Sequence, residues 1–161
     1  MSLARLQTGD PRPVLAPLAG LEVSESKDAT ALAALTGRTA EAIEQRLAGG
    51  HRSFVASLAG ESAAFGWVAT HSATLGELGV TVRLQRHERY LWNFVTLPAH
   101  RGRGLYPRLL AAILDRLAGE GVQHAWIAYA PENRASESGI VRAGFTPVAD
   151  LSFDRTGRVS W

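Results

Sequence analysis

The stretch Phe94–Leu117, FVTLPAHRGRGLYPRLLAAILDRL, carries the local pattern that decides the fold of this 161-residue chain. It begins with residues typical of a strand, breaks at Pro98 and passes through the tetrapeptide Arg101–Gly104. From Leu105 onward, apolar residues recur at helical spacing and form one stripe. Proline has no N–H to lose, so Pro107 is tolerated in the first helical turn. The pattern therefore predicts a strand, a glycine-rich turn and an amphipathic helix.

The turn between this strand and helix is predicted to bind an anion. The first N–H groups of a helix have no partner within it and carry positive partial charge, and glycine lets a ligand approach the backbone. Gly102 and Gly104 can form a nest of N–H donors, and Arg101, Arg103 and Arg108 add charge nearby. A phosphate or pyrophosphate is the natural guest. The P-loop and dinucleotide-binding glycine patterns do not fit, because no lysine follows the turn and proline stands at the third glycine position. The alternative for an isolated RGRG is a tight turn with solubilising arginines.

Length, composition and charge restrict the class of protein. The chain is 46% hydrophobic and long enough for one globular domain. It has no cysteine, and its five histidines lack metal-binding spacing, so no metal site is predicted. The net charge of +2 and the absence of basic–aromatic interleaving argue against a nucleic-acid partner. No apolar stretch reaches the length of a membrane span or a signal peptide. We expect a cytoplasmic monomer or homodimer that binds neither nucleic acid nor membrane.

The rest of the sequence predicts an α/β protein with a mixed sheet. Residues 1–13 contain a glycine and two prolines and predict a leader, either loose and disordered or an early edge segment, before a single domain over residues 14–161. The expected order is strand, two helices, three or four strands, helix, strand, helix and two strands. Thr39 is a plausible N-cap, and residues 71–79 are expected to form a loop.

Two segments together resemble the GNAT-type N-acetyltransferase superfamily. VTLPAHRGRGLYPRLL (residues 95–110) is similar to that superfamily's acetyl-CoA motif. WIAYAPENRASESGIVRAGF (residues 126–145) is similar to the strand–helix motif that follows it, in which an asparagine and a terminal Gly-Phe recur. The likeness covers Leu91 to Val148, a little over a third of the chain. It implies the GNAT acyltransferase fold, an α/β architecture in which helices flank a central mixed, mostly antiparallel, splayed β-sheet. It also implies acetyl-CoA as cosubstrate and direct transfer of the acetyl group to an amine of a small molecule or peptide.

The resemblance also implies which residues contact acetyl-CoA. The strand before the turn would hydrogen-bond the pantetheine, the turn would bind the pyrophosphate, and the motif asparagine would contact the cofactor arm. Tyr106 stands where the family usually has Gly or Ala, and its ring is expected to point toward the acceptor pocket or the sheet. The implied cofactor-binding residues are Phe94, Val95, Thr96, Arg101, Gly102, Arg103, Gly104, Leu105, Tyr106, Pro107, Asn133 and Ser136.

At the two positions where family members commonly carry a catalytic acid or base, this sequence has residues that can be neither. Ile140 stands where many members have a tyrosine, and Ala128 where some have a glutamate. Three explanations stay open: another residue acts as the acid, the thiolate leaves unaided, or the protein binds CoA without catalysis. The last describes a catalytically weak or inactive acyl-CoA-binding module. The candidate catalytic residues are Glu77, Asn93, Tyr106 and Tyr129, with Glu88 as a further possible base.

Strand alternation predicts which faces the side chains near the site occupy. Trp126 and Ala128 are expected on one face of their strand and Tyr129 on the other, whereas Trp92 and Phe94 are expected to share a face. The acceptor is expected to be chosen by residues 28–50 and 71–79, which carry no readable motif.

Overall fold

The computed structural model describes residues 1–75, 79–153 and 159–160. The helices are α1 (Ala29–Thr36), α2 (Ala40–Ala48), α3 (Leu105–Gly119) and α4 (Arg134–Arg142). The strands are β1 (Ser2–Gln7), β2 (Leu21–Ser26), β3 (His51–Leu58), β4 (Glu61–Ala69), β5 (Ser72–Leu75), β6 (Val80–Arg83), β7 (Glu88–Thr96), β8 (His124–Tyr129), β9 (Thr146–Asp150), β10 (Ser152–Phe153) and β11 (Val159–Ser160).

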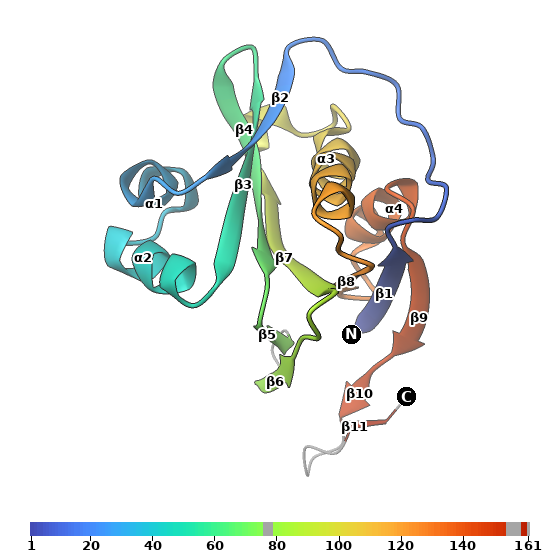
Figure 1. Ribbon diagram of the computed structural model, residues 1–161. Helices are drawn as coiled ribbons and strands as arrows, with labels where there is room; N and C mark the ends of the chain where they lie inside the picture. The colour runs from blue at the N-terminus through green and yellow to red at the C-terminus, as the bar shows by residue number, and fades with distance from the viewer. Residues whose placement is uncertain (76–78, 154–158, 161) are drawn as a thin grey trace.

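The main sheet has seven strands in the order β2-β3-β4-β7-β8-β1-β9. All of its neighbouring strands are antiparallel except β7 and β8, which are parallel. Helices α1 and α2 cover one face, and α3 and α4 cover the other (Figure 1). This arrangement confirms the predicted mixed, mostly antiparallel sheet flanked by helices.

Each face of the sheet has its own apolar core. On the α3/α4 face, the predicted apolar stripe of α3 is buried, with Leu109, Ile113 and Leu117 at most 1% exposed. On the α1/α2 face, Leu32 and Ile43 pack against fully buried strand residues that include Trp67. Burying one such side chain contributes about 1.5–3 kcal/mol relative to leaving it exposed, so packing rather than propensity holds these short helices in place.

Two capped helix starts set the positions of α1 and α2. Asp28 Oδ1 accepts a hydrogen bond from the Ala31 N–H at 2.9 Å. Thr39 Oγ1 accepts one from the Ala42 N–H at 3.2 Å, which confirms the predicted N-cap. Among the described residues, no helix is long and apolar enough to cross a membrane.

Strands β7 and β8 separate after a short paired segment. Their parallel pairing ends at Leu91 and Ile127. Just beyond, β7 contains a β-bulge, where Asn93 and Phe94 together lie opposite Gly66 of β4. Asn93 has a φ of 52°, in the left-handed region that asparagine tolerates better than most residues. The sheet is therefore splayed, and the bulge lies where the gap opens.

The bulge corrects one prediction about side-chain direction. Trp92 and Phe94 do not share a face, because the extra residue between them reverses the alternation. Trp92 packs toward the α1/α2 face and Phe94 toward the α3/α4 face. In β8, where the alternation is regular, Tyr129 lies opposite Trp126 as predicted.

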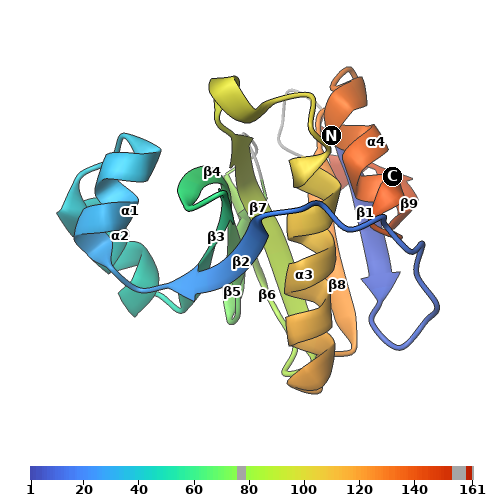
Figure 2. The ribbon, with the colours of Figure 1, turned by 90° about the horizontal axis from the view of Figure 1, so that it is seen from above.

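Two segments form strands that the sequence analysis did not assign as such; for residues 1–13 it had left open a loose leader or an early edge segment. Residues 2–7, assigned to the leader, form β1 between β8 and β9, and the alternation that buries Ala4 and Leu6 fits this position. Residues 8–20 then cross α3 to reach β2 (Figure 2). In the segment expected to be a loop, β5 pairs with β6 from Ser72↔Arg83 to Leu75↔Val80. Residues 76–78, between these strands, lie outside the described part of the chain.

Candidate functional site

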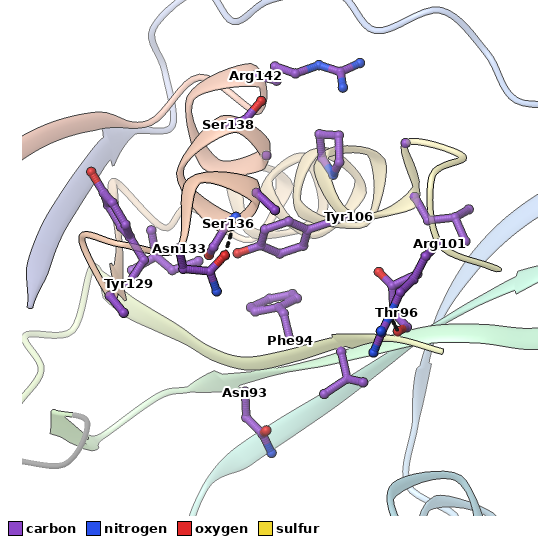
Figure 3. A pocket seen from close by; sticks show the side chains of 18 of the residues that line it. Asn93, Phe94, Thr96, Arg101, Tyr106, Tyr129, Asn133, Ser136, Ser138 and Arg142 are labelled. Atoms are coloured by element: carbon purple, nitrogen blue, oxygen red, sulfur yellow. Dashed lines mark hydrogen bonds between the residues drawn. The ribbon is translucent and has the colours of Figure 1, made fainter. Parts of the chain in front are cut away.

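A cavity of about 900 Å³ occupies the gap between β7 and β8. Its lining comes from β7, the glycine turn, the start of α3, β8 and α4 (Figure 3). Phe94 and Tyr129 belong to the α3/α4 face of the sheet, whereas Trp92, Val95 and Ala128 belong to the opposite face. Since side chains of both faces line one cavity, it passes through the plane of the sheet.

The glycine turn presents an array of backbone donors to this cavity. Gly102 and Gly104 have φ values of 76° and 66°, which L side chains rarely adopt. Helix α3 has no side-chain N-cap, and the N–H groups of residues 102–106 donate no hydrogen bond to another described residue. Pro107 lines the cavity but has no N–H. Such an array, at the positive end of a 15-residue helix, fits a phosphate group.

The arginines of the turn differ in their relation to the cavity. Arg101 lines it and donates from Nε to the Thr96 carbonyl oxygen at 3.2 Å. Arg103 is exposed and does not line the cavity. Arg108 donates from Nε to the carbonyl oxygen of Ala16 at 2.9 Å, which ties the crossing segment to α3. Its Nη1 donates to the Gly104 carbonyl oxygen at 2.8 Å, so Arg108 supports the turn and does not face the anion site.

Two residues that line the cavity were not assigned to the site by the sequence analysis. Arg142, on α4, lines the cavity and is exposed. His100 lines it with a side chain that is 13% exposed and Nε2 4.0 Å from Glu61 Oε2. No local motif marks Arg142, because its place in the site depends on how α4 docks beside the turn.

Two aromatic rings fill the space between β4 and α4 beside the cavity. The rings of Phe94 and Tyr106 are tilted, with centroids 5.5 Å apart (Figure 3). Glycines flank this pair: a Cβ on Gly66 would lie 2.1 Å from the Phe94 ring, and one on Gly139 would lie 2.4 Å from the Tyr106 ring. The Tyr106 ring therefore points toward the sheet. Burial raises the pKa of the Tyr106 hydroxyl to about 12, so it stays protonated at neutral pH and can donate a proton.

Helix α4 brings the other predicted residues to the cavity. Asn133 is its N-cap, and Asn133 Oδ1 accepts a hydrogen bond from the Ser136 N–H at 3.0 Å (Figure 3). Both residues line the cavity, as does Tyr129. The Tyr129 hydroxyl donates to Glu137 Oε1 at 3.5 Å and is directed away from Tyr106 (Figure 3). Burial and the nearby Glu137 carboxylate raise the pKa of Tyr129.

Of the three candidate bases, Asn93, Glu88 and Glu77, the two that the structure describes do not lie together. Asn93 lines the cavity on the side of β7 away from Phe94 and Tyr106 (Figure 3). Glu88 accepts hydrogen bonds from Trp126 Nε1 at 3.2 Å and the Gln85 N–H at 2.9 Å, and it lines a separate cavity of about 340 Å³. Glu77 lies outside the described residues. No Asp or Glu is among the described residues that line the gap.

A splayed sheet beside a helix start whose first N–H groups have no partner among the described residues fits an acyltransferase that uses a CoA thioester. The chain belongs to the Acetyltransferase (GNAT) family, whose pattern matches residues 24–145. This match confirms the predicted superfamily and enzyme class, and it supports acetyl-CoA, the family's cosubstrate, as the acetyl donor. It begins after β1, which therefore lies outside the matched region.

Solved structures of similar fold agree with this assignment, and no curated protein matches the chain significantly. One is aminoglycoside N-acetyltransferase AAC(6')-Iy in complex with CoA (18% identity, 83% of this chain and 98% of that chain covered, TM-score 0.60). Another is the ribosomal-protein-S18-alanine N-acetyltransferase from Escherichia coli (19% identity, 86% of this chain and 88% of that chain covered, TM-score 0.62). A third is yncA from Salmonella typhimurium with acetyl-CoA (20% identity, 82% of this chain and 82% of that chain covered, TM-score 0.60). At these identities the likeness concerns the fold alone.

Proposed function

We propose that the protein is an N-acetyltransferase that moves the acetyl group of acetyl-CoA directly to an amine inside the gap between β7 and β8. The observation that carries this proposal is the single cavity that reaches from the N–H array at residues 102–106, through the sheet, to Trp92 on the opposite face. Two substrates can enter such a cavity from opposite sides and meet at its centre. Holding both reactants in one geometry supplies up to about 7–11 kcal/mol of the barrier reduction in favourable cases.

The described residues fit the diphosphate and pantetheine arm of the donor. Residues 102–106 offer main-chain donors, and Arg101 and Arg142 supply positive charge at the same end of the cavity. Along β7, the Leu97 N–H donates to the Ala63 carbonyl oxygen of β4 at 2.9 Å. Alternation then turns the backbone groups of Thr96 and Phe94 toward the gap, where β8 no longer pairs with them. The Thr96 carbonyl oxygen already accepts from Arg101 Nε, so the Thr96 N–H and the Phe94 groups are the ones proposed to hydrogen-bond an extended amide chain.

In the transfer itself, the neutral amine attacks the thioester carbonyl carbon, the C–S bond breaks, the amine loses a proton and the thiolate gains one. Tyr106 is the hydroxyl that we assign to the thiolate, because it lines the cavity and is protonated at neutral pH. Because no described carboxylate lines the gap, Asn93 holds the water that takes the amine's proton.

The acceptor is an amine of a small molecule or peptide. AAC(6')-Iy acts on aminoglycosides, but this cavity lacks a lining carboxylate among its described residues. A polycationic acceptor would gain no favourable charge pair there. The composition of the lining therefore favours an acceptor with few positive charges.

The proposal is tested by CoA binding and thiol release. Isothermal titration should show that CoA binds the wild type, and Arg142→Gln should weaken binding on the order of tenfold, as expected for one charged contact. Arg134→Gln is the matched control, since Arg134 lies on the same helix but does not line the cavity. Equal affinity of the two variants would remove Arg142 from the site, and absence of CoA binding by the wild type would overturn the proposal. CoA binding without thiol release for any amine would identify a catalytically inactive module instead.

A further inference from the structure

The separate cavity of about 340 Å³ that Glu88 borders, here called the apolar pocket, lies between the main sheet and the hairpin of β5 and β6. It lies on the face of the sheet that carries Trp92 and Ala128, in a part that the hairpin covers and that is apart from α1 and α2 (Figure 1). Its walls are almost wholly apolar. Six of the residues that line it belong to one apolar cluster: Leu3, Leu75, Val82, Leu84, Tyr90 and Trp126.

The cluster that forms the apolar pocket continues to the cavity in the gap between β7 and β8. Trp92 and Ala128 pack in the same cluster, and both line the gap. Tyr90 and Trp126 face each other across the parallel pair of strands. Trp92 and Ala128 each follow two residues later in the same strand, on the same face. Two residues of a strand span roughly 6.7 Å, so the pocket and the gap are neighbours.

The apolar pocket is large enough for an aromatic ring. Pockets that bind small molecules have volumes of about 300–1,000 Å³ and apolar walls with few polar groups. An engineered apolar cavity of about 150 Å³ in another protein binds benzene. A volume of about 340 Å³ therefore has room for a substituted ring or for two fused rings. Val82, Leu84 and Trp126 are only half-buried, so a ligand can reach the pocket from solvent.

The polar groups of the pocket favour an uncharged occupant. Trp126 Nε1 donates to Glu88 Oε1 at 3.2 Å, so the indole presents its apolar surface to a ligand. Burial raises the pKa of the Tyr90 hydroxyl to about 12, so this hydroxyl is neutral at neutral pH. Among the described lining residues, the charged side chains are Glu88 and Arg83, which have opposite signs. A charged group would lose hydration in this pocket and gain no net attraction, whereas an apolar ring gains from burial.

The position of the pocket suits the acceptor of the transfer reaction. Binding of a part of the substrate that is remote from the reacting atom can hold that atom in place for reaction. A linker of about two to four carbon atoms, at about 1.5 Å a bond, bridges the distance from the pocket to the gap. A ring held beside Trp126 then places an attached amine next to Trp92 and Asn93, which line the gap.

We infer that the apolar pocket is the acceptor subsite, and that the acceptor is an amine joined by a short linker to an uncharged aromatic ring. This inference rests on the proposed function and adds the chemical class of the acceptor. The ring lies among Tyr90, Val82 and Trp126, and the amine reaches the gap beside Asn93. The subsite thus holds the acceptor by its apolar end while the amine faces the thioester.

Indole NMR tests the pocket without requiring turnover. The protein, with CoA present and labelled at tryptophan Nε1, is titrated with 2-phenylethylamine and with tryptamine. The control ligand is 2-methoxyethylamine, an amine of similar basicity that lacks a ring. We expect a saturable shift of the Trp126 signal with at least one ring-bearing amine and none with the control at the same concentrations. An equal response to all three amines, or no response to either ring-bearing amine, would overturn the inference.

Variants that fill the pocket identify where the ring binds. Val82→Phe and Val80→Phe each add a ring to a residue that lines the pocket, and they should abolish the shift while thermal unfolding shows that they stay folded. Thr81→Phe is the matched control, because Thr81 lies between them in β6, is exposed and points to the opposite face. A shift that persists in both filled variants would overturn the inference. So would a Trp126 signal that depends on protein concentration and not on the amine, since a second copy of the chain would then cover the pocket.

Steady-state kinetics separates this inference from the proposed function. We expect the wild type to favour a ring-bearing amine over 2-methoxyethylamine in kcat/KM by on the order of 10- to 100-fold, as for the burial of one ring. Val82→Phe should remove the preference by raising the acceptor KM, with the KM for acetyl-CoA unchanged. Acetylation of all three amines with equal kcat/KM would refute the subsite and leave the transferase. A Trp126 shift without acetylation of any amine would support the pocket as a ring-binding site and refute the transferase.

Discussion

Replacing Gly66 by alanine is expected to destabilise the protein by about 1–2 kcal/mol, because the new methyl group collides with Phe94. The Cβ would lie 2.1 Å from Cε1 and 2.3 Å from Cδ1 of that ring. Carbon atoms pack at about 3.5–4.0 Å, so the ring must move by about 1.4 Å or more. It cannot move freely, because Tyr106 and then Gly139 lie behind it. Overpacking of this kind costs about 1–3 kcal/mol, and alanine recovers about 0.5–1 kcal/mol of backbone entropy relative to glycine.

Urea and thermal unfolding measure this effect. For a domain of this size, the net cost corresponds to a fall in Tm of about 2–8 °C. The displaced ring also narrows the gap, so the KM for acetyl-CoA should rise. Gly119→Ala is the control, since a Cβ there meets nothing within 4 Å, and it should be neutral or stabilising.

A double-mutant cycle shows whether the collision is the cause. In a Phe94→Ala background, Gly66→Ala should cost little, which gives a coupling of about 1 kcal/mol or more. If the two costs add without coupling, the close approach of ring and glycine is not what requires Gly66, and the reasoning fails.

Three further predictions concern charge, catalysis and a helix start. The Arg52 guanidinium holds the pKa of Glu120 at about 2, below its ordinary value of 4.5, so this pair's stabilisation is complete above pH 4.5 and is lost as pH falls from 4.5 toward 2. Glu120→Gln should reduce the slope of stability against pH in that window, and an unchanged acid-unfolding curve would contradict this. Tyr106→Phe should lower kcat by about 100-fold or more with the KM for acetyl-CoA unchanged, whereas an unaltered kcat would exclude the hydroxyl as proton donor. Asp28→Ala removes the cap on the Ala31 N–H and should cost about 1 kcal/mol in urea unfolding, and an unchanged midpoint would show that the cap does not stabilise the fold.

Local patterns in the sequence were sufficient for α3 and the turn before it. The leucine stripe, the glycines and the early proline all act within one or two helical turns, so neighbouring residues determine the structure there. The caps at Asp28 and Thr39 are equally local. The glycine turn and the start of α3 therefore lie where the pattern placed them, although Arg108 supports the turn from behind.

Features that depend on distant partners could not be read in this way. Strand β1 is only six residues long and precedes a segment rich in glycine and proline, and its place between β8 and β9 depends on residues more than 100 positions away. The contacts of Arg46 with Trp67 and Trp92 join α2 to β4 and β7, and nothing near Arg46 in the sequence marks them. A salt-bridged or exposed helical arginine would look the same.

The bulge at Asn93 explains how one strand can place an aromatic ring on each face of the sheet at the gap. In a regular strand, Trp92 and Phe94 would point to the same face, and the other face of the gap would lack an aromatic wall. One inserted residue sends Trp92 to the face where Arg46 lies and Phe94 to the face where Tyr106 lies. The same insertion coincides with the end of pairing to β8, which opens the cavity between the two rings. Deleting Asn93 should therefore reverse one of the two side chains, so that the variant keeps either Phe94 beside Tyr106 or Trp92 beside Arg46 but not both.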